Sequence, residues 1–180
     1  MASLDREVSA ENRKVSRYLL FYPDLKKQYF ERREEILGGT QTPDPATPAP
    51  GRSTARPTSD PTGAAALALT SRSVEFDCNG KAVWMTLAEM EKWLALCEEV
   101  EERIPWKMQI FLRLRRDYRT AQGRHGWAAA VQWRFAKELA QHLKRREQDV
   151  WVESLETFSR WWARIVEYAA RLAAKKGLLQ

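Results

Sequence analysis

The sequence predicts a mainly α-helical protein with an N-terminal helical segment, a proline-rich linker, and a C-terminal helical bundle that contains a helix-turn-helix-like pair and one small β-hairpin. Apolar residues recur at spacings of three and four in several stretches, most regularly between 154 and 177. Thr86 and Glu89 form a capping box, which marks a helix start. Residues 40–62 hold six of the eight prolines and lack apolar periodicity. We therefore expect a segment 1–39, a linker 40–62 and a domain 63–180.

The N-terminal segment reads as two helices separated at a proline. Val15, Tyr18 and Leu19 share one helix face, and Pro23 then interrupts the pattern, since proline is tolerated best in the first turn of a new helix. The second helix carries a looser apolar stripe and ends at Gly38. A helix of this size cannot bury its own aromatic face, so it must pack on another chain or on the rest of this one. Self-association into a homo-oligomer is the first expectation.

The next elements are a short helix, a hairpin and a long helix. The Ala-rich stretch 63–69 has the length of two helical turns, and residues 74–85 read as two strands joined at Asn79-Gly80, the favoured pair for a type I′ turn. The capping box at Thr86 opens a helix that ends near Pro105. A further helix follows from about 105 to 118, and glycines at 123 and 126 break the chain. We expect the following helix to bury an apolar stripe: Trp127, Val131, Phe135 and Leu139.

The last helix is the most regular element of the sequence. Ser154 is expected as its N-cap and Gly177 as its stop. One face is apolar: Leu155, Phe158, Trp162, Ile165, Ala169 and Leu172. The opposite face holds four cations among six residues: Thr157, Arg160, Arg164, Tyr168, Arg171 and Lys175. This pattern is typical of a DNA-recognition helix, and equally of a solvated surface helix.

The charge of the chain is unevenly distributed. From Arg103 onward there are 17 Lys and Arg against 7 Asp and Glu, a net charge of +10, whereas the first 102 residues carry 13 against 17, a net charge of −4. The two parts together give the total of +6. A basic C-terminal portion favours a polyanionic partner, most simply nucleic acid, over a role in solubility alone.

Other classes of protein are disfavoured by the sequence. The motifs of phosphate-binding loops, zinc proteases and serine hydrolases are missing, so we expect neither an enzyme nor a bound cofactor. Cys78 and Cys97 are too few for a disulfide framework, and the two histidines match no standard metal spacing. Without a signal peptide or an apolar run of about 18 residues, the expectation is a cytoplasmic protein that does not bind membranes.

Cations gather at the places where a DNA-binding module would hold phosphates. They lie at the end of the helix 105–118, in the loop after it, and along the last helix, whose first turns would enter the major groove. The candidate DNA-binding residues are Arg115, Arg116, Arg119, Arg124, Ser154, Thr157, Arg160, Arg164 and Arg171. Glu156 is a further candidate for base reading. Trp151 and Trp161 flank that face and are expected to pack inside the protein.

The order of these segments is similar to that of a known family. The matching stretches are 17–26 (RYLLFYPDLK), 31–37 (ERREEIL), 59–62 (SDPT), 93–104 before a proline, the Arg-rich 111–118, Gly126-Trp127, and 157–161 (TFSRW). In this layout the chain resembles the phage late-gene transcriptional regulators of the RinA/ArpU type, whose C-terminal part is similar to region 4 of sigma factors. The resemblance extends over almost the full length, through short motifs.

The resemblance implies sequence-specific binding of double-stranded DNA through a helix-turn-helix, control of phage packaging, structural or lysis genes, and RNA polymerase as a partner. Thr157 and Arg160 would then face bases or phosphates, with Trp127 in the supporting helix. One departure is the long charged bridge from Leu139 to Glu153, where such motifs have a turn of three or four residues. Two alternatives stay open: a phage DNA-packaging adaptor, similar to a small terminase subunit, that grips DNA non-specifically, and a helical protein-interaction module.

Overall fold

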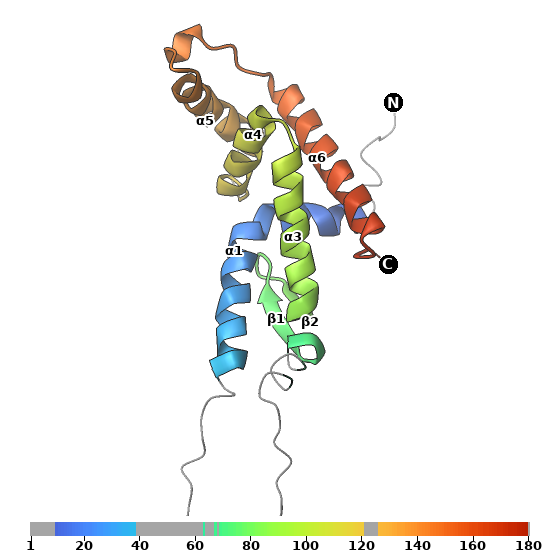
Figure 1. Cartoon of the computed structure of the whole chain (residues 1–180). Coiled ribbons are helices and arrows are strands. Elements are labelled where there is room, and N and C mark those ends of the chain that lie inside the picture. The colour runs from blue at the N-terminus through green and yellow to red at the C-terminus, as the bar shows by residue number, and fades with distance from the viewer. Residues whose placement is uncertain (1–9, 39–62, 64–66, 68, 121–125, 180) are drawn as a thin grey trace, which may run out of the picture. The chain divides into compact units, whose positions relative to one another are not determined.

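The computed structural model describes residues 10–38, 63, 67, 69–120 and 126–179 (Figure 1). The mainly helical fold with one small hairpin is confirmed. The elements, labelled as in Figure 1, are α1 (Ala10–Gly38), β1 (Ser73–Asp77), β2 (Ala82–Thr86), α3 (Leu87–Arg103), α4 (Trp106–Asp117), α5 (Gly126–Leu143), the 3-10 turn η1 (Glu147–Asp149) and α6 (Leu155–Lys175). In the stretch expected as a short helix, the described residues Gly63, Leu67 and Leu69 are helical.

The chain forms two compact units. The first consists of Met1–Pro23 with Trp93–Gln180, and the second of Asp24–Lys92. The expected boundaries at 39 and 62 stay a prediction.

Helix α1 does not break at Pro23, contrary to the prediction: one helix runs from Ala10 to Gly38 with the proline inside it. Proline has no N–H, so the carbonyl of Leu19, four residues earlier, loses its usual intrahelical donor. A side chain supplies that donor, because Arg116 Nε donates to the Leu19 carbonyl oxygen at 3.0 Å. A long-range hydrogen bond thus satisfies the acceptor that the proline leaves without an intrahelical donor.

The apolar face of α1 is buried by the chain itself. In the first unit Val15, Tyr18 and Leu19 are buried, and the ring of Tyr18 stacks on that of Trp93 with centroids 4.3 Å apart. In the second unit three apolar side chains of α1 are likewise buried: Leu25, Tyr29 and Ile36. Of the two ways to cover this face, packing on the rest of the chain is the one realised. The main reason for expecting self-association is thereby removed.

The second unit contains the hairpin as predicted. β1 and β2 pair antiparallel, with Asp77 opposite Ala82, and the N–H of Cys78 donates to the carbonyl of Lys81 at 3.0 Å. Asn79 and Gly80 have φ of 60° and 71°, the left-handed values that a type I′ turn needs at both central positions. The side-chain amide of Gln28 in α1 donates from Nε2 to the carbonyl of Asp77 at 2.9 Å and accepts at Oε1 from the N–H of Asp77 at 2.7 Å. The two-stranded sheet is therefore held to its neighbouring helix.

The capping box is also confirmed. The backbone N–H of Thr86 donates to Glu89 Oε2 at 2.8 Å, and the N–H of Glu89 donates to Thr86 Oγ1 at 3.2 Å. Two N–H groups at the start of α3 are satisfied in this way. The helix ends at Arg103, two residues before Pro105, as expected.

Candidate nucleic-acid interface

Four aromatic rings from three helices of the first unit hold α6 in place. Phe111 of α4 stacks on Phe158 of α6 with centroids 5.4 Å apart, and Phe135 of α5 meets Phe158 edge-on at 5.1 Å. Trp161 completes the group, 5.6 Å from Phe158. The three phenylalanines have no solvent exposure. This aromatic cluster (Phe111, Phe135, Phe158 and Trp161) fixes the position of α6 against α4 and α5.

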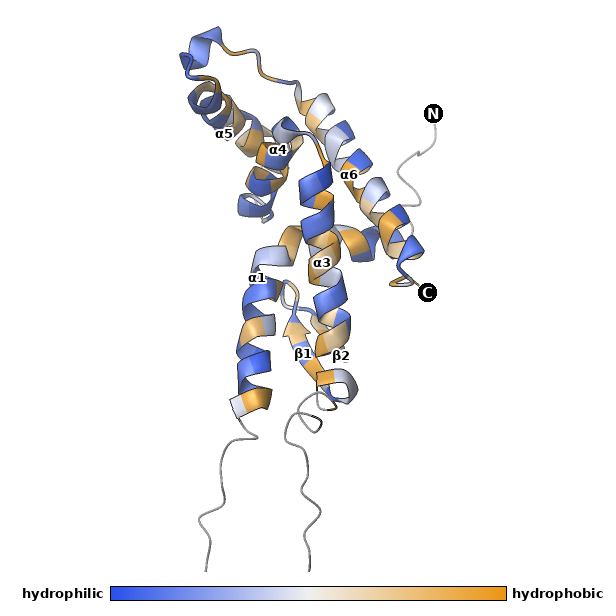
Figure 2. Cartoon of the chain, in the orientation of Figure 1, coloured by the Kyte–Doolittle hydropathy of each residue, from blue (hydrophilic) through white to orange (hydrophobic). Residues whose placement is uncertain are grey.

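The buried stripe of α6 follows the prediction closely. Phe158, Ile165, Ala169 and Leu172 are buried, while Leu155 and Trp162 are half-buried. Figure 2 shows hydrophobic and hydrophilic residues interspersed along the whole of α6. One face of α6 is therefore committed to the core, and the other is left to solvent.

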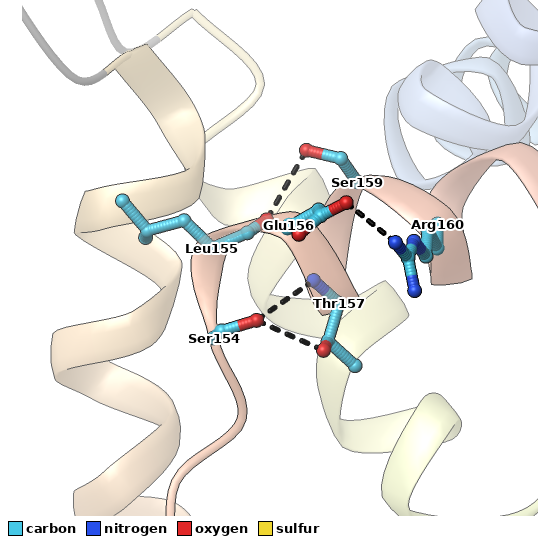
Figure 3. Close-up of polar contacts among 6 residues, drawn as sticks. All are labelled: Ser154, Leu155, Glu156, Thr157, Ser159 and Arg160. Atoms are coloured by element: carbon cyan, nitrogen blue, oxygen red, sulfur yellow. Dashed lines mark hydrogen bonds and ion pairs between the residues drawn. The ribbon is translucent and has the colours of Figure 1, made fainter.

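The first turn of α6 is capped as expected. Ser154 Oγ accepts a hydrogen bond from the N–H of Thr157 at 3.2 Å and lies 3.0 Å from Thr157 Oγ1 (Figure 3). One turn further on, Ser159 Oγ donates to the carbonyl of Leu155 at 3.2 Å. These hydroxyls are engaged within the helix. Ser154 and Thr157 therefore shape the helix start, and an external ligand would have to compete with those local bonds.

The arginines of α6 are exposed, and two of them pair with glutamates on the same helix. Arg160, 67% exposed, bonds Glu156 at 2.5 Å, as Figure 3 shows, and Arg171 bonds Glu167. Arg164 is exposed and forms no ion pair or hydrogen bond with any residue that the structure describes. Exposed pairs of this spacing stabilise a helix by only about 0.3–0.5 kcal/mol. A polyanion could therefore displace the glutamates at little cost.

The arginines at the end of α4 face the interior instead of solvent. Arg116 is 5% exposed; besides bonding the Leu19 carbonyl, it pairs with Glu101 at 2.6 Å and lies 4.7 Å from the ring centroid of Tyr22. Arg119 is half-buried and donates to the carbonyl of Arg116 at 2.9 Å. These side chains link α4 to α1 and α3. We therefore do not carry Arg116 or Arg119 into the candidate interface.

Arg115 is buried between two indole rings. Its guanidinium carbon lies 4.3 Å from the ring centroid of Trp127 and 5.4 Å from that of Trp162, and the residue is 7% exposed. Burial lowers the pKa of Arg115 to about 10. Cation–π contact with both rings offsets part of the cost of burying the charge. A side chain in this position cannot reach a phosphate, so we exclude Arg115 from the candidate DNA-binding residues. The candidate Arg124 lies outside the described residues.

The connection between α5 and α6 is not the short turn of a helix-turn-helix. It comprises residues 144–154, eleven residues that include η1, and both ends of this segment are defined by the helices. Gln132 Nε2 donates to the carbonyl of Glu153 at 2.9 Å, so the connection runs back along α5 before α6 begins. The supporting helix also extends beyond Leu139 to Leu143. The long bridge expected from the sequence therefore consists partly of the extended helix α5 and partly of the eleven-residue connection.

The connection carries exposed residues that the candidate set missed. Lys144, Arg145 and Arg146 are consecutive and exposed, and this part of the chain is hydrophilic in Figure 2. Trp151 is 82% exposed, so the expectation that it packs inside the protein is wrong, whereas Trp161 does pack. The run of three cations is visible in the sequence. The three cations are not among the predicted DNA-binding residues, because helical spacing assigns residues to a face only within a helix and these follow the end of α5.

Within the described ranges, no helix has the length and apolar character needed to cross a lipid bilayer. Both cysteines are buried, and burial raises the pKa of the Cys97 thiol to about 12. Comparison of the chain with protein-family models, with curated proteins and with solved structures finds no match. We therefore infer the function from the geometry of the first unit.

Proposed function

We propose that this protein is a sequence-specific DNA-binding transcriptional regulator of phage type, without enzymatic activity, that places the first three turns of α6 in the major groove of double-stranded DNA. The observation that carries the proposal is the exposed face of α6. Arg160 and Arg164 project from it while the opposite face is fixed by the aromatic cluster. A rigidly held helix with exposed arginines near its N-terminus is what base reading in the major groove requires.

The exposed side chains of α6 are proposed to have two roles, reading bases and holding the DNA backbone. Arg164 has no partner among the described residues, so within that part of the chain nothing competes with a phosphate or a guanine for it. Arg160 can exchange Glu156 for a guanine, and the released carboxylate can accept from a cytosine amino group. Each good bidentate contact contributes about 1–3 kcal/mol of discrimination. Arg171, more than four turns from the helix start at Leu155, is placed to hold the DNA backbone and not to read bases.

The wider role rests on the resemblance to the RinA/ArpU-type regulators. On that basis the protein would act at promoters of phage late genes together with RNA polymerase, in the cytoplasm. Homo-oligomer formation belongs to the same proposal, although the apolar face of α1 is buried by the chain and the contact would need another surface. Eleven residues connect α5 to α6, so the pair lacks the tight turn of a helix-turn-helix. We expect α6 to dock on DNA as other recognition helices do.

The test is a binding titration on selected and scrambled DNA. A site is first enriched from a random duplex pool with the full chain, and affinities are then measured by fluorescence anisotropy at several salt concentrations. A regulator binds the selected site at least about 10³-fold more tightly than the scrambled one. A ratio near one with a steep salt dependence supports the packaging adaptor instead. Absence of binding at low salt refutes both DNA functions and leaves the protein-interaction module.

Arginine substitutions show whether α6 forms the interface. Arg160→Ala is expected to cost about 1–3 kcal/mol on the selected site and much less on the scrambled one, because a base contact is lost. The matched control is Arg32→Ala, which removes an exposed arginine of α1 that pairs with Glu35, three residues later in the same helix, at 2.9 Å. The control should bind like the unchanged protein. Equal losses for Arg160→Ala on both DNAs would make this residue a phosphate contact, and no loss would remove α6 from the interface.

A further inference from the structure

Helix α5 is followed by a lysine whose backbone adopts a conformation that residues with a side chain disfavour. Lys144, the first residue after the helix, has a φ of 52°, in the left-handed region. Its N–H donates to the carbonyl of Gln141 at 3.2 Å, and the N–H of Arg145 donates to the carbonyl of Ala140 at 2.9 Å. This is a Schellman motif, whose left-handed position is usually occupied by glycine because a side chain there crowds the backbone.

The same chain uses glycine at the equivalent position of α6. Gly177 has a φ of 68°, its N–H donates to the carbonyl of Ala174 at 3.0 Å, and the N–H of Leu178 donates to the carbonyl of Ala173 at 2.9 Å. The two helix ends therefore have the same hydrogen bonds and differ in the residue that adopts the left-handed conformation. The backbone of α5 would be served better by glycine at 144.

Neither packing nor the helix dipole explains the lysine. Lys144 is exposed, so its side chain contributes nothing to the core. A cation near the C-terminus of a helix is favourable, but a lysine one residue earlier or later would supply the same charge without the strain. Arg145 and Arg146 already do so. None of these three side chains forms an ion pair with a residue that the structure describes, although Glu147 and Asp149 follow directly in η1.

We propose that Lys144, Arg145 and Arg146 form a phosphate-binding cluster that grips the DNA backbone beside the groove occupied by α6. The inference rests on the proposed function and adds a second contact point to it. The hydrogen bond between Gln132 and Glu153 places the start of α6 near residue 132 of α5, and the cluster lies at the other end, beyond Leu143. At 1.5 Å per residue, these points of α5 are about 16 Å apart. The major groove is about 12 Å wide, so a separation of this size is large enough for the cluster to reach a phosphate strand that borders the groove.

The decisive variant is Lys144→Gly, because it is expected to raise the thermal stability of the protein and to lower its affinity for DNA. Relief of the left-handed side chain is expected to raise the Tm by about 1–4 °C. Loss of one phosphate contact is expected to weaken DNA binding about 3- to 10-fold at low salt, equally on the selected and the scrambled site, and to reduce the slope of log K against log salt by about one. Gly177→Ala is the matched control: it should lower the Tm and leave DNA binding unchanged.

The outcomes separate the cluster from the proposed function. If the unchanged protein binds DNA and Lys144→Gly keeps its affinity and salt slope, the cluster is refuted while the regulator proposal stands. A lower Tm for Lys144→Gly refutes the claim that the lysine is retained against the backbone preference. Arg145→Ala with Arg146→Ala, which leaves the strained position intact, should reduce the salt slope by about two. If the unchanged protein does not bind DNA at low salt, both proposals fail together, and binding to anionic lipid vesicles instead would assign the cluster to a membrane surface.

Discussion

The hydrogen bond from Arg116 to the Leu19 carbonyl leads to a quantitative prediction about Pro23. In an unbroken helix the N–H of residue 23 would donate to this carbonyl, and Pro23 cannot. Arg116 Nε replaces that donor at 3.0 Å and is itself 5% exposed. Part of the cost of removing the guanidinium should therefore depend on whether position 23 can supply its own donor.

The magnitude follows from the contacts of Arg116. A buried hydrogen bond from a charged donor contributes about 1.5–3 kcal/mol. The ion pair with Glu101, whose carboxylate side chain is 37% exposed, adds about 1 kcal/mol or less, and contact with the Tyr22 ring adds about 0.5–1 kcal/mol. Arg116→Met, which keeps most of the side-chain volume, should thus lower the free energy of unfolding by about 2–5 kcal/mol.

The second step repeats the substitution with alanine at position 23. Pro23→Ala restores an N–H for the Leu19 carbonyl, so Arg116→Met should cost about 1–2 kcal/mol less in this background. Urea unfolding followed by circular dichroism and by tryptophan fluorescence gives the four free energies, and agreement of the two probes checks that unfolding is two-state. An interaction energy below about 0.3–0.5 kcal/mol would mean that the two sites are independent, and the reasoning about the proline would be wrong.

Three further predictions concern the cap, the core and a thiol. Ser154→Ala should lower the free energy of unfolding by about 1 kcal/mol in urea, whereas Ser154→Thr should keep most of the cap; equal losses would count against capping. Phe158→Ala should cost about 3–5 kcal/mol in the same assay, because it empties the aromatic cluster, and a loss below 1 kcal/mol would contradict the packing. The raised pKa of Cys97, from 9.0 to about 12, makes stability fall as pH rises from about 9, since the unfolded thiol loses its proton first. Unfolding at pH 8 and 10, with Cys97→Ala as control, checks this, and a pH dependence that survives the substitution would exclude Cys97 as its source.

Features that depend on a few neighbouring residues could be predicted from the sequence. The turn at Asn79-Gly80, the capping box at Thr86 and the N-cap at Ser154 all follow from bonds within four residues, and all three are present. The buried stripe of α6 is also local, because helical periodicity places its members on one face. These signals determine where elements start and which face they bury.

Features that depend on partners far apart in the sequence could not be predicted from it. Nothing near Pro23 indicates that Arg116, far away in the sequence, donates to the Leu19 carbonyl and allows the helix to continue. Arg115 and Arg116 look like surface cations in an Arg-rich run, and only the positions of Trp127 and Glu101 show that they are internal. Charge composition predicts that a surface is basic, but it does not tell which arginines reach that surface.

The long connection between α5 and α6 changes where the specificity of a DNA contact would be encoded. A tight turn dictates the angle between two helices through its backbone, and eleven residues cannot do so. The direction of α6 is set instead by ring contacts with Phe111 and Phe135. A change of volume at either buried ring would redirect the helix and alter the preferred DNA site, although neither residue touches DNA. Recognition would then evolve through the core of the protein as readily as through its surface.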